Sequence, residues 1–236
     1  GPMCQGVSQR GPRDPHDERN FAFWAFADYV RACAPRYFVM ENVPALVSDV
    51  HNRGLAIAVF EELESLGYNL TAEVLNAAWF QVPQLRYRLI VVGMRDAEPT
   101  FPAVVREGTE GLLSEADFTP VGHAIMDLPA IDAGRGNLKT VMPPMPTGAS
   151  TFLREIRRGT RTLHNHVSAN TDEVNLRRIR HVPEGGNWRD IPRALLPERF
   201  KHVRPSDHTT TYRRLDRDHP AFTVTTECGN VTSGAF

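Results

Sequence analysis

A short apolar run that ends in a carboxylate places the strongest constraint on how this chain folds. Residues Tyr37 to Met40 are apolar and are followed directly by Glu41. A run this short, bounded by helical patterns, is typical of a buried strand in a parallel sheet. In open α/β sheets, functional groups gather beyond the carboxyl ends of the strands. The run therefore predicts a buried parallel strand with an acidic side chain at its functional end.

Two helices are predicted on either side of this strand. Asn20 is placed to cap a helix that runs to Cys33 and stops before Pro35. Apolar residues recur at helical spacing from Leu55 to Leu66, and Gly67 suits the left-handed residue that follows a helix.

Two further strands are predicted after the second helix. They lie near Leu70 to Leu75 and from Tyr87 to Met94, separated by the turn-like Gln81-Val82-Pro83. Strand, helix, strand and strand in this order predict part of an open α/β sheet.

The pattern changes beyond Arg95. Residues 97 to 150 are rich in proline and glycine, and residues 151 to 210 are rich in arginine. Alternation of apolar residues with threonine then predicts a strand-like return over Tyr212 to Thr226. The second half therefore reads as an irregular insertion followed by a short return.

The charges are distributed unevenly along the chain. Residues 1–150 carry 12 Lys and Arg against 18 Asp and Glu, whereas residues 151–220 carry 15 against 9. A basic block of net +6 on a chain of net charge −1 favours a surface that faces a polyanion. A solvated basic face is the alternative.

Composition excludes several classes of protein. No apolar run approaches the roughly 20 residues that a membrane span requires, so no membrane partner is expected. Cys4, Cys33 and Cys228 are odd in number and form no CxxC pair, which favours a reducing compartment over a disulfide framework. Without a cysteine cluster the nine histidines predict no metal site.

Three residue types could carry chemistry. Cys4 lies in a small polar loop that could present a thiolate, Glu41 ends a strand, and Arg86 and Arg88 are two apart and so share a strand face. Taken singly, each has an ordinary alternative: an inert thiol, a solvated acid and an exposed strand edge. The combination and order of these residues decide between a catalytic role and the ordinary alternatives.

Three motifs occur in one order and at characteristic separations. They are Cys4-Gln5-Gly6, Glu41-Asn42-Val43-Pro44, and Val82-Pro83-Gln84-Leu85-Arg86-Tyr87-Arg88. This series strongly resembles the DNA (cytosine-5)-methyltransferase family. Further matches, over 17–20, 212–215 and 219–226, extend the resemblance from residue 2 to about residue 230.

The resemblance implies a fold and three regions. The fold is α/β, a partial Rossmann-like sheet of an S-adenosylmethionine-dependent methyltransferase with an inserted irregular target-recognition domain. Residues 1–97 would be the partial catalytic α/β subdomain, 98–211 the target-recognition region with its linker, and 212–236 a return to the catalytic subdomain.

The resemblance also implies a mechanism on a flipped-out cytosine of duplex DNA. Cys4 would add to C6 of the base, and Glu41 would contact N3 and the exocyclic amine. Arg86 and Arg88 would orient the carboxylate and the base. Gln5, Asn42 and Gln84 would hold the loop and substrate geometry.

The basic block occupies the place of the family's target-recognition region. Arginine suits phosphate contact and guanine readout in the major groove. The candidate DNA-binding residues are Arg177, Arg178, Arg180, Arg189, Arg213 and Arg214. Gly185-Gly186-Asn187-Trp188 is either a turn at the DNA cleft or an ordinary loop that packs its tryptophan.

The cofactor motifs of the family are not matched. The glycine-containing turn for S-adenosylmethionine has no counterpart, Met3 stands where proline usually precedes the cysteine, and the family's last motif is missing. Gly134-Arg135-Gly136 lies in the wrong region for this turn. We therefore expect an untethered Cys4 and, for the chain alone, weak or no binding of the cofactor and no activity.

An exposed strand edge is a further expectation, because the neighbour of the Tyr37–Met40 strand is missing. That edge would accept a complementing N-terminal polypeptide or a second copy. A cytoplasmic, bacterial-type protein associated with the nucleoid is expected. The alternatives are a non-catalytic DNA-binding or regulatory homologue and an RNA cytosine-5 methyltransferase.

Overall fold

The helix predicted after Asn20 forms as α1 (Phe21–Cys33) in a computed structural model of the chain. The structure describes residues 1–2, 20–102, 118–204, 206–225, 229–233 and 236. Residues 1–80 and 86–110 make up one unit, here called unit 1. Residues 81–85 and 111–236 make up the second, here called unit 2.

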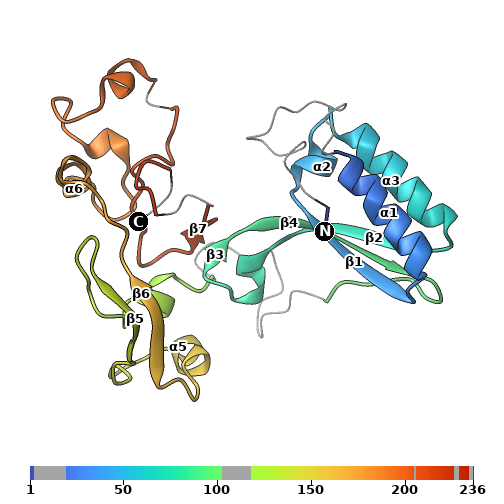
Figure 1. The fold of residues 1–236 in the computed structure, drawn as a ribbon, viewed down its shortest axis with the longest axis horizontal. Coiled ribbons are helices and arrows are strands. Elements are labelled where there is room, and N and C mark those ends of the chain that lie inside the picture. The colour runs from blue at the N-terminus through green and yellow to red at the C-terminus, as the bar shows by residue number, and fades with distance from the viewer. Residues whose placement is uncertain (3–19, 103–117, 205, 226–228, 234–235) are drawn as a thin grey trace. The chain divides into compact units, whose positions relative to one another are not determined.

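Unit 1 is built on a three-stranded sheet (Figure 1). The strands are β1 (Tyr37–Asn42), β2 (Asn69–Asn76) and β4 (Tyr87–Met94), in the order β1-β4-β2. Strand β4 runs antiparallel to both of its neighbours, so β1 and β2 are the edge strands of the described sheet. The predicted positions of all three strands are confirmed.

The prediction that the first strand is a buried parallel strand is wrong within the described residues. Strand β1 pairs antiparallel with β4, from Tyr37 opposite Met94 to Asn42 opposite Leu89. Its side chains alternate between exposed and buried, so helices cover only one face of it. An apolar run shows that a strand forms, but it does not show the direction of the neighbouring strand.

Helices α1 and α3 (Arg53–Ser65) lie side by side and supply the core over that face (Figure 1). Phe23 of α1, Leu63 of α3, Met40 of β1 and Val91 of β4 are all completely buried. Gly67 ends α3 with a φ of +87°, the left-handed conformation predicted for it. Between β1 and α3 lies the short helix α2 (Ala45–Ser48).

Unit 2 consists of short elements and two small sheets. Strand β3 (Gln84–Leu85) pairs parallel with β7 (Ala221–Phe222), and β5 (Gly136–Val141) pairs antiparallel with β6 (Thr162–Val167). The helices are α4 (Gly122–Ile125), α5 (Thr151–Ile156) and α6 (Glu173–Ile179), with 3-10 turns η4 (Trp188–Asp190) and η5 (Glu198–His202). A further 3-10 turn, η2 (Ala77–Phe80), belongs to unit 1.

Aromatic side chains form the core of unit 2. Trp188, Phe200 and Tyr212 are buried with Val182 and Ile191 in one cluster. The interpretation of 185–188 as a loop that packs its tryptophan is therefore confirmed. Among the described helices, none has the length and apolar character needed to span a membrane.

The strand-like return predicted over Tyr212 to Thr226 is largely wrong. Only Ala221 and Phe222 are in a strand among the residues described there. Their partner strand β3 is only two residues long, which limits the ladder that the threonine alternation can form. The predicted division at residues 97 and 211 stays a prediction.

Candidate functional site

Glu41 lies one residue before the carboxyl end of β1. It is opposite Ile90 of β4, and alternation along both strands puts Arg88 on the same face as Glu41. This face of the sheet is the one turned away from the core, since Met40, Asn42 and Leu89 on the other face are buried. The strand pairing alone therefore brings the predicted carboxylate and one predicted guanidinium together.

Glu41 and Arg88 form an ion pair. Arg88 Nε lies 2.8 Å from Glu41 Oε1, and the Arg88 and Glu41 side chains are 22% and 52% exposed. Arg88 also donates from Nη1 to the carbonyl oxygen of Tyr87 at 2.7 Å. These two bonds fix the guanidinium, while about half of the Glu41 side chain stays exposed to solvent.

Asn42 ties the end of β1 to the first described residues of the chain. Its side chain is buried, donates from Nδ2 to the carbonyl oxygen of Pro2 at 3.0 Å, and accepts from the backbone N–H of Val43. The loop-holding role expected of Asn42 stays a prediction. Cys4 and Gln5 lie outside the described residues.

Arg86 and Gln84 are placed differently from Arg88. Arg86 precedes β4, and its backbone N–H and carbonyl bond to Asn76 and Ala77. Arg86 lies one residue before the first residue of β4, so the expected strand face shared with Arg88 stays a prediction. Gln84 is in β3 of unit 2, where it pairs with Ala221.

The six candidate DNA-binding arginines divide by their surroundings. Arg177 and Arg180 are exposed on and just after α6, and Arg189 is exposed on η4. Arg178 instead reaches inward to the Leu195 carbonyl and the Tyr212 hydroxyl. Its contacts brace the core of unit 2.

Arg213 and Arg214 also have partners within unit 2. Arg213 stacks its guanidinium 3.4 Å from the ring centre of Phe222. Burial lowers the pKa of Arg213, and the positive charge of Arg189 adds to this shift. Arg214 donates from Nη1 to the carbonyl oxygen of Val182.

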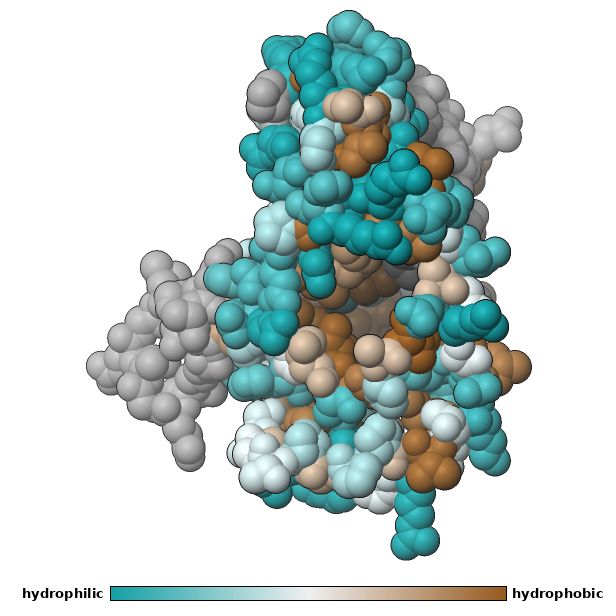
Figure 2. Space-filling view, turned by 90° about the vertical axis from the view of Figure 1, so that its left-hand side faces the viewer, coloured by the Kyte–Doolittle hydropathy of each residue, from teal (hydrophilic) through white to brown (hydrophobic). Residues whose placement is uncertain are grey.

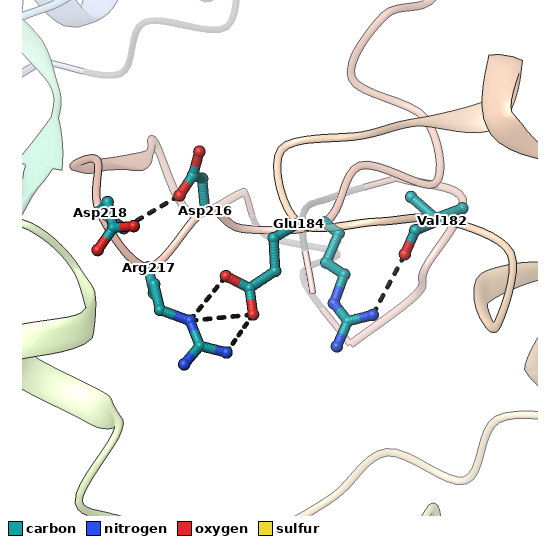
Figure 3. Close-up of polar contacts among 6 residues, drawn as sticks. Val182, Glu184, Asp216, Arg217 and Asp218 are labelled. Carbon is teal, nitrogen blue, oxygen red and sulfur yellow. Dashed lines mark hydrogen bonds and ion pairs between the residues drawn. The ribbon is translucent and has the colours of Figure 1, made fainter.

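Two polar features of the structure escape prediction from the sequence. Arg217 donates hydrogen bonds to both carboxylate oxygens of Glu184, as Figure 3 shows. This pair lies beside a cavity of about 230 Å³ whose other walls include Ile125, Leu215 and Phe236. Figure 2 shows a hollow with a largely apolar lining on a mostly hydrophilic face. Glu184 and Arg217 are 33 residues apart in the sequence, so no local sequence pattern predicts the pair.

Asn76 is the second polar feature that the sequence does not clearly predict. It is completely buried at the end of β2, and its Oδ1 accepts two backbone N–H bonds. An asparagine just before a turn is the only hint that the sequence gives. Among the described residues, no group of three or more His, Cys, Asp and Glu side chains could hold a metal ion.

Comparison with protein families gives one match over most of the chain. The model described as C-5 cytosine-specific DNA methylase matches residues 1–223.

Curated relatives are about one-third identical to this chain over the residues that align. The type II methyltransferase M1.HphI of Haemophilus parahaemolyticus is 33% identical over 236 residues, which cover 98% of this chain and 52% of that protein. M.DdeI of Desulfomicrobium norvegicum is 32% identical over 170 residues, covering 71% and 40%. DNA (cytosine-5)-methyltransferase 4 of Arabidopsis thaliana is 30% identical over 222 residues, covering 81% and 14%. The chain thus spans about half, or less, of the length of these relatives.

One solved structure has a similar fold. It is described as a DNA modification methyltransferase encoded within an E. coli prophage. The TM-score is 0.60 at 16% identity, and the match covers 95% of this chain and 60% of that one. This likeness confirms the predicted α/β fold, a partial Rossmann-like methyltransferase sheet.

Proposed function

Because the chain belongs to the C-5 cytosine-specific DNA methylase family, we propose that it supplies the base-binding part of a site that methylates C5 of cytosine in duplex DNA. One observation carries this proposal. Arg88 holds Glu41 at 2.8 Å on the open face of the sheet, and half of the Glu41 side chain is exposed. A carboxyl group oriented by an arginine is suited to the edge of a cytosine ring.

Glu41 is the group that recognises the base in this proposal. A protonated carboxyl can donate to N3 of cytosine and accept from the exocyclic amine at the same time. Protonation of N3 draws electrons from C6, which makes that carbon more open to a nucleophile. Arg88 keeps the carboxyl in the required orientation, and Arg86 lies two residues before it along the chain.

Cys4 is the proposed nucleophile. Its thiolate forms a bond to C6, and the electron pair of the C5–C6 double bond moves toward C5 and N3. After C5 is methylated, its proton is lost and the bond between sulfur and C6 breaks. Asn42, which follows Glu41 directly, donates to the carbonyl oxygen of Pro2, two residues before Cys4 in the sequence.

The methyl group comes from S-adenosylmethionine in this proposal, but the Gly134-Arg135-Gly136 turn does not fit that donor. A Cβ on Gly136 would lie 2.1 Å from the His166 carbonyl oxygen, so this glycine permits the pairing of β5 with β6. The Gly134-Arg135-Gly136 turn is therefore part of a β ribbon, and we assign no donor step to it.

A further polypeptide segment is the proposed holder of the donor. Relatives about twice as long as this chain support this view, as do the open edges of β1 and β2 in the described sheet. The segment would be a complementing N-terminal polypeptide, whereas a second copy of the chain would pair with the open strand edges without adding a donor site. The isolated chain would then be inactive.

Duplex DNA is the proposed substrate, with the target base flipped out of the stack. The exposed Arg177, Arg180 and Arg189 would contact phosphates, and the protein would act on cytoplasmic, nucleoid-associated DNA. A non-catalytic DNA-binding homologue and an RNA cytosine-5 methyltransferase are the alternatives that the experiment must separate.

Covalent trapping provides that experiment. The chain is mixed with a polypeptide that carries the cofactor-binding half of a relative, S-adenosylmethionine, and duplexes containing 5-fluorocytosine in randomised sequence. The fluorine blocks the final elimination, so an active site is held as a protein–DNA adduct. Adduct formation with DNA and not with matched RNA supports the proposal.

The controls use the chain's own cysteines. Cys4→Ser is expected to abolish the adduct, whereas Cys33→Ser is expected to leave it unchanged, since Cys33 is an exposed free cysteine outside the motifs. Tight DNA binding without any adduct would favour the non-catalytic homologue. An adduct with RNA alone would favour the RNA enzyme.

A further inference from the structure

Asn76 joins two backbone segments that leave and re-enter unit 1. The chain passes from β2 through η2, contributes 81–85 to unit 2, and returns at Arg86. Asn76 Oδ1 accepts the N–H of Ala78 at 3.2 Å, on the outgoing side, and the N–H of Arg86 at 3.0 Å, on the returning side. One buried oxygen therefore binds both sides of the excursion.

The neighbouring backbone closes the same junction. The N–H of Ala77 donates to the carbonyl oxygen of Arg86 at 3.0 Å, and Asn76 is opposite Tyr87 as the last pair of the β2–β4 ladder. The Asn76 side chain thus bonds to the backbone N–H immediately before β4 begins. It therefore acts beside the first residue of β4, which also belongs to the last pair of that ladder.

Register decides which face Arg88 occupies. A slip by one residue would turn every side chain of β4 to the opposite face, so Arg88 would leave Glu41 and enter the core. Arg88 follows Arg86 by two residues, so the bond from Arg86 to Asn76 fixes the backbone close to the ion pair. We infer that Asn76 is a positioning residue that holds Arg86 and Arg88 in the arrangement that presents Glu41 to the base. This inference rests on the proposed function.

The two ends of the Asn76 amide differ, which makes the inference testable. Oδ1 takes both bonds, whereas the buried Nδ2 has no hydrogen-bond partner in the described part of the chain. Asn76→Asp keeps an acceptor of the same shape, and Asn76→Ala removes it. Asn69→Ala is the matched control, because Asn69 is exposed at the other end of β2 and its side chain donates to the Ala97 carbonyl.

The first measurement is backbone amide exchange in the full chain at neutral pH. In Asn76→Ala, exchange at Ala78 and Arg86 is expected to accelerate at least tenfold relative to the wild type and to Asn69→Ala. Asn76→Asp is expected to restore most of that protection. Unchanged exchange at Arg86 in a folded Asn76→Ala would overturn the inference.

The second measurement is the rate of the covalent adduct with 5-fluorocytosine DNA in the complemented enzyme. Asn76→Ala is expected to lower the rate at saturating DNA at least tenfold and to leave DNA affinity within twofold. A purely structural role would instead lower the amount of adduct through loss of folded protein and leave the rate constant of the folded molecules unchanged. A smaller amplitude with an unchanged rate constant would therefore overturn the inference.

Two further outcomes, a variant that does not fold and a wild-type protein that forms no adduct, can be told apart from those above. If Asn76→Ala does not fold, Asn76→Asp carries the test: protection at Arg86 with a rate closer to wild type supports the inference, and loss of both overturns it. If the wild-type protein forms no adduct, the proposed function fails, while amide exchange at Arg86 still decides what Asn76 does.

Discussion

Arg88 and Glu41 lie on neighbouring antiparallel strands and meet diagonally on the open face of the sheet, with Nε and Oε1 2.8 Å apart. An ion pair this exposed contributes little to stability, about 0–1 kcal/mol. In the proposed function, its placement therefore serves base binding more than folding.

Removing the guanidinium tests that view. Arg88→Ala is expected to lower the rate of adduct formation roughly 100-fold, the usual effect of losing an oriented electrostatic group, while unfolding free energy changes by less than about 1 kcal/mol. Arg88→Lys should fall in between, because lysine lacks the planar fork. Adduct kinetics and urea unfolding measure the two effects.

Arg36→Ala is the matched control. Arg36 is also in unit 1 and faces Asp96 with Nε and Oδ2 3.8 Å apart, both well exposed. Arg36→Ala should change neither the rate of adduct formation nor the free energy of unfolding. A similar loss of rate in both variants would count against a special role for Arg88.

Gly93 is expected to tolerate no side chain. It is opposite Phe38, and an added Cβ would lie 2.3 Å from that ring. Phe38 in turn meets Phe26 and Tyr68 edge to face, so its ring has little room to move. Gly93→Ala is expected to destabilise the protein by about 1–3 kcal/mol, measured by urea unfolding.

Replacing glycine by alanine should have the opposite effect on the free energy of unfolding at Gly54. Gly54 is in α3 with nothing within 4 Å of an added Cβ, so Gly54→Ala should stabilise by about 0.5–1 kcal/mol. Adding Phe38→Leu to Gly93→Ala should recover part of the loss, because the two residues are in contact. Strict additivity in that cycle would contradict the proposed clash.

The elements that local patterns control were predictable from the sequence. Pro35 and the apolar stripe gave the helix that ends at Cys33, and the apolar run gave β4 at Tyr87–Met94. The direction of β1 was not predictable, because it depends on β4, which lies about 50 residues later. The Tyr212 return failed for a related reason, since its partner β3 supplies only Gln84 and Leu85.

The candidate site was predictable to the same extent. Motif order selected Glu41 and Arg88 as candidates, and the two side chains form an ion pair across the paired strands β1 and β4. Which arginines face solvent was not predictable. Arg178 donates to the carbonyl oxygen of Leu195, and Arg214 donates to that of Val182. These contacts exist only after the chain has folded.

Acid is expected to weaken unit 2 through Glu184. Hydrogen bonds from Arg217 lower the pKa of this carboxyl from 4.5 to about 2. A carboxyl whose pKa is lowered by folding stabilises the protein above its unfolded pKa, and that contribution is lost as the pH falls from about 4.5 to about 2. Urea unfolding across that range should show the loss in the wild type. Glu184→Gln should remove this part of the pH dependence, and a profile unchanged by the substitution would refute the assignment.

The ion pair between Arg157 and Asp127 should matter far more for stability than the exposed pairs. Arg157 Nη1 and Asp127 Oδ2 are 2.7 Å apart, with the side chains only 8% and 3% exposed. Arg157 also bonds to the Pro143 carbonyl, which anchors the chain after β5. Asp127→Ala leaves a buried charge without its partner, so a loss of about 3–5 kcal/mol in unfolding free energy is expected. Glu173→Ala, which breaks the exposed pair with Arg180 at 3.9 Å, is the control and should cost less than about 1 kcal/mol. Equal costs in the two variants would show that burial does not set the strength of these pairs.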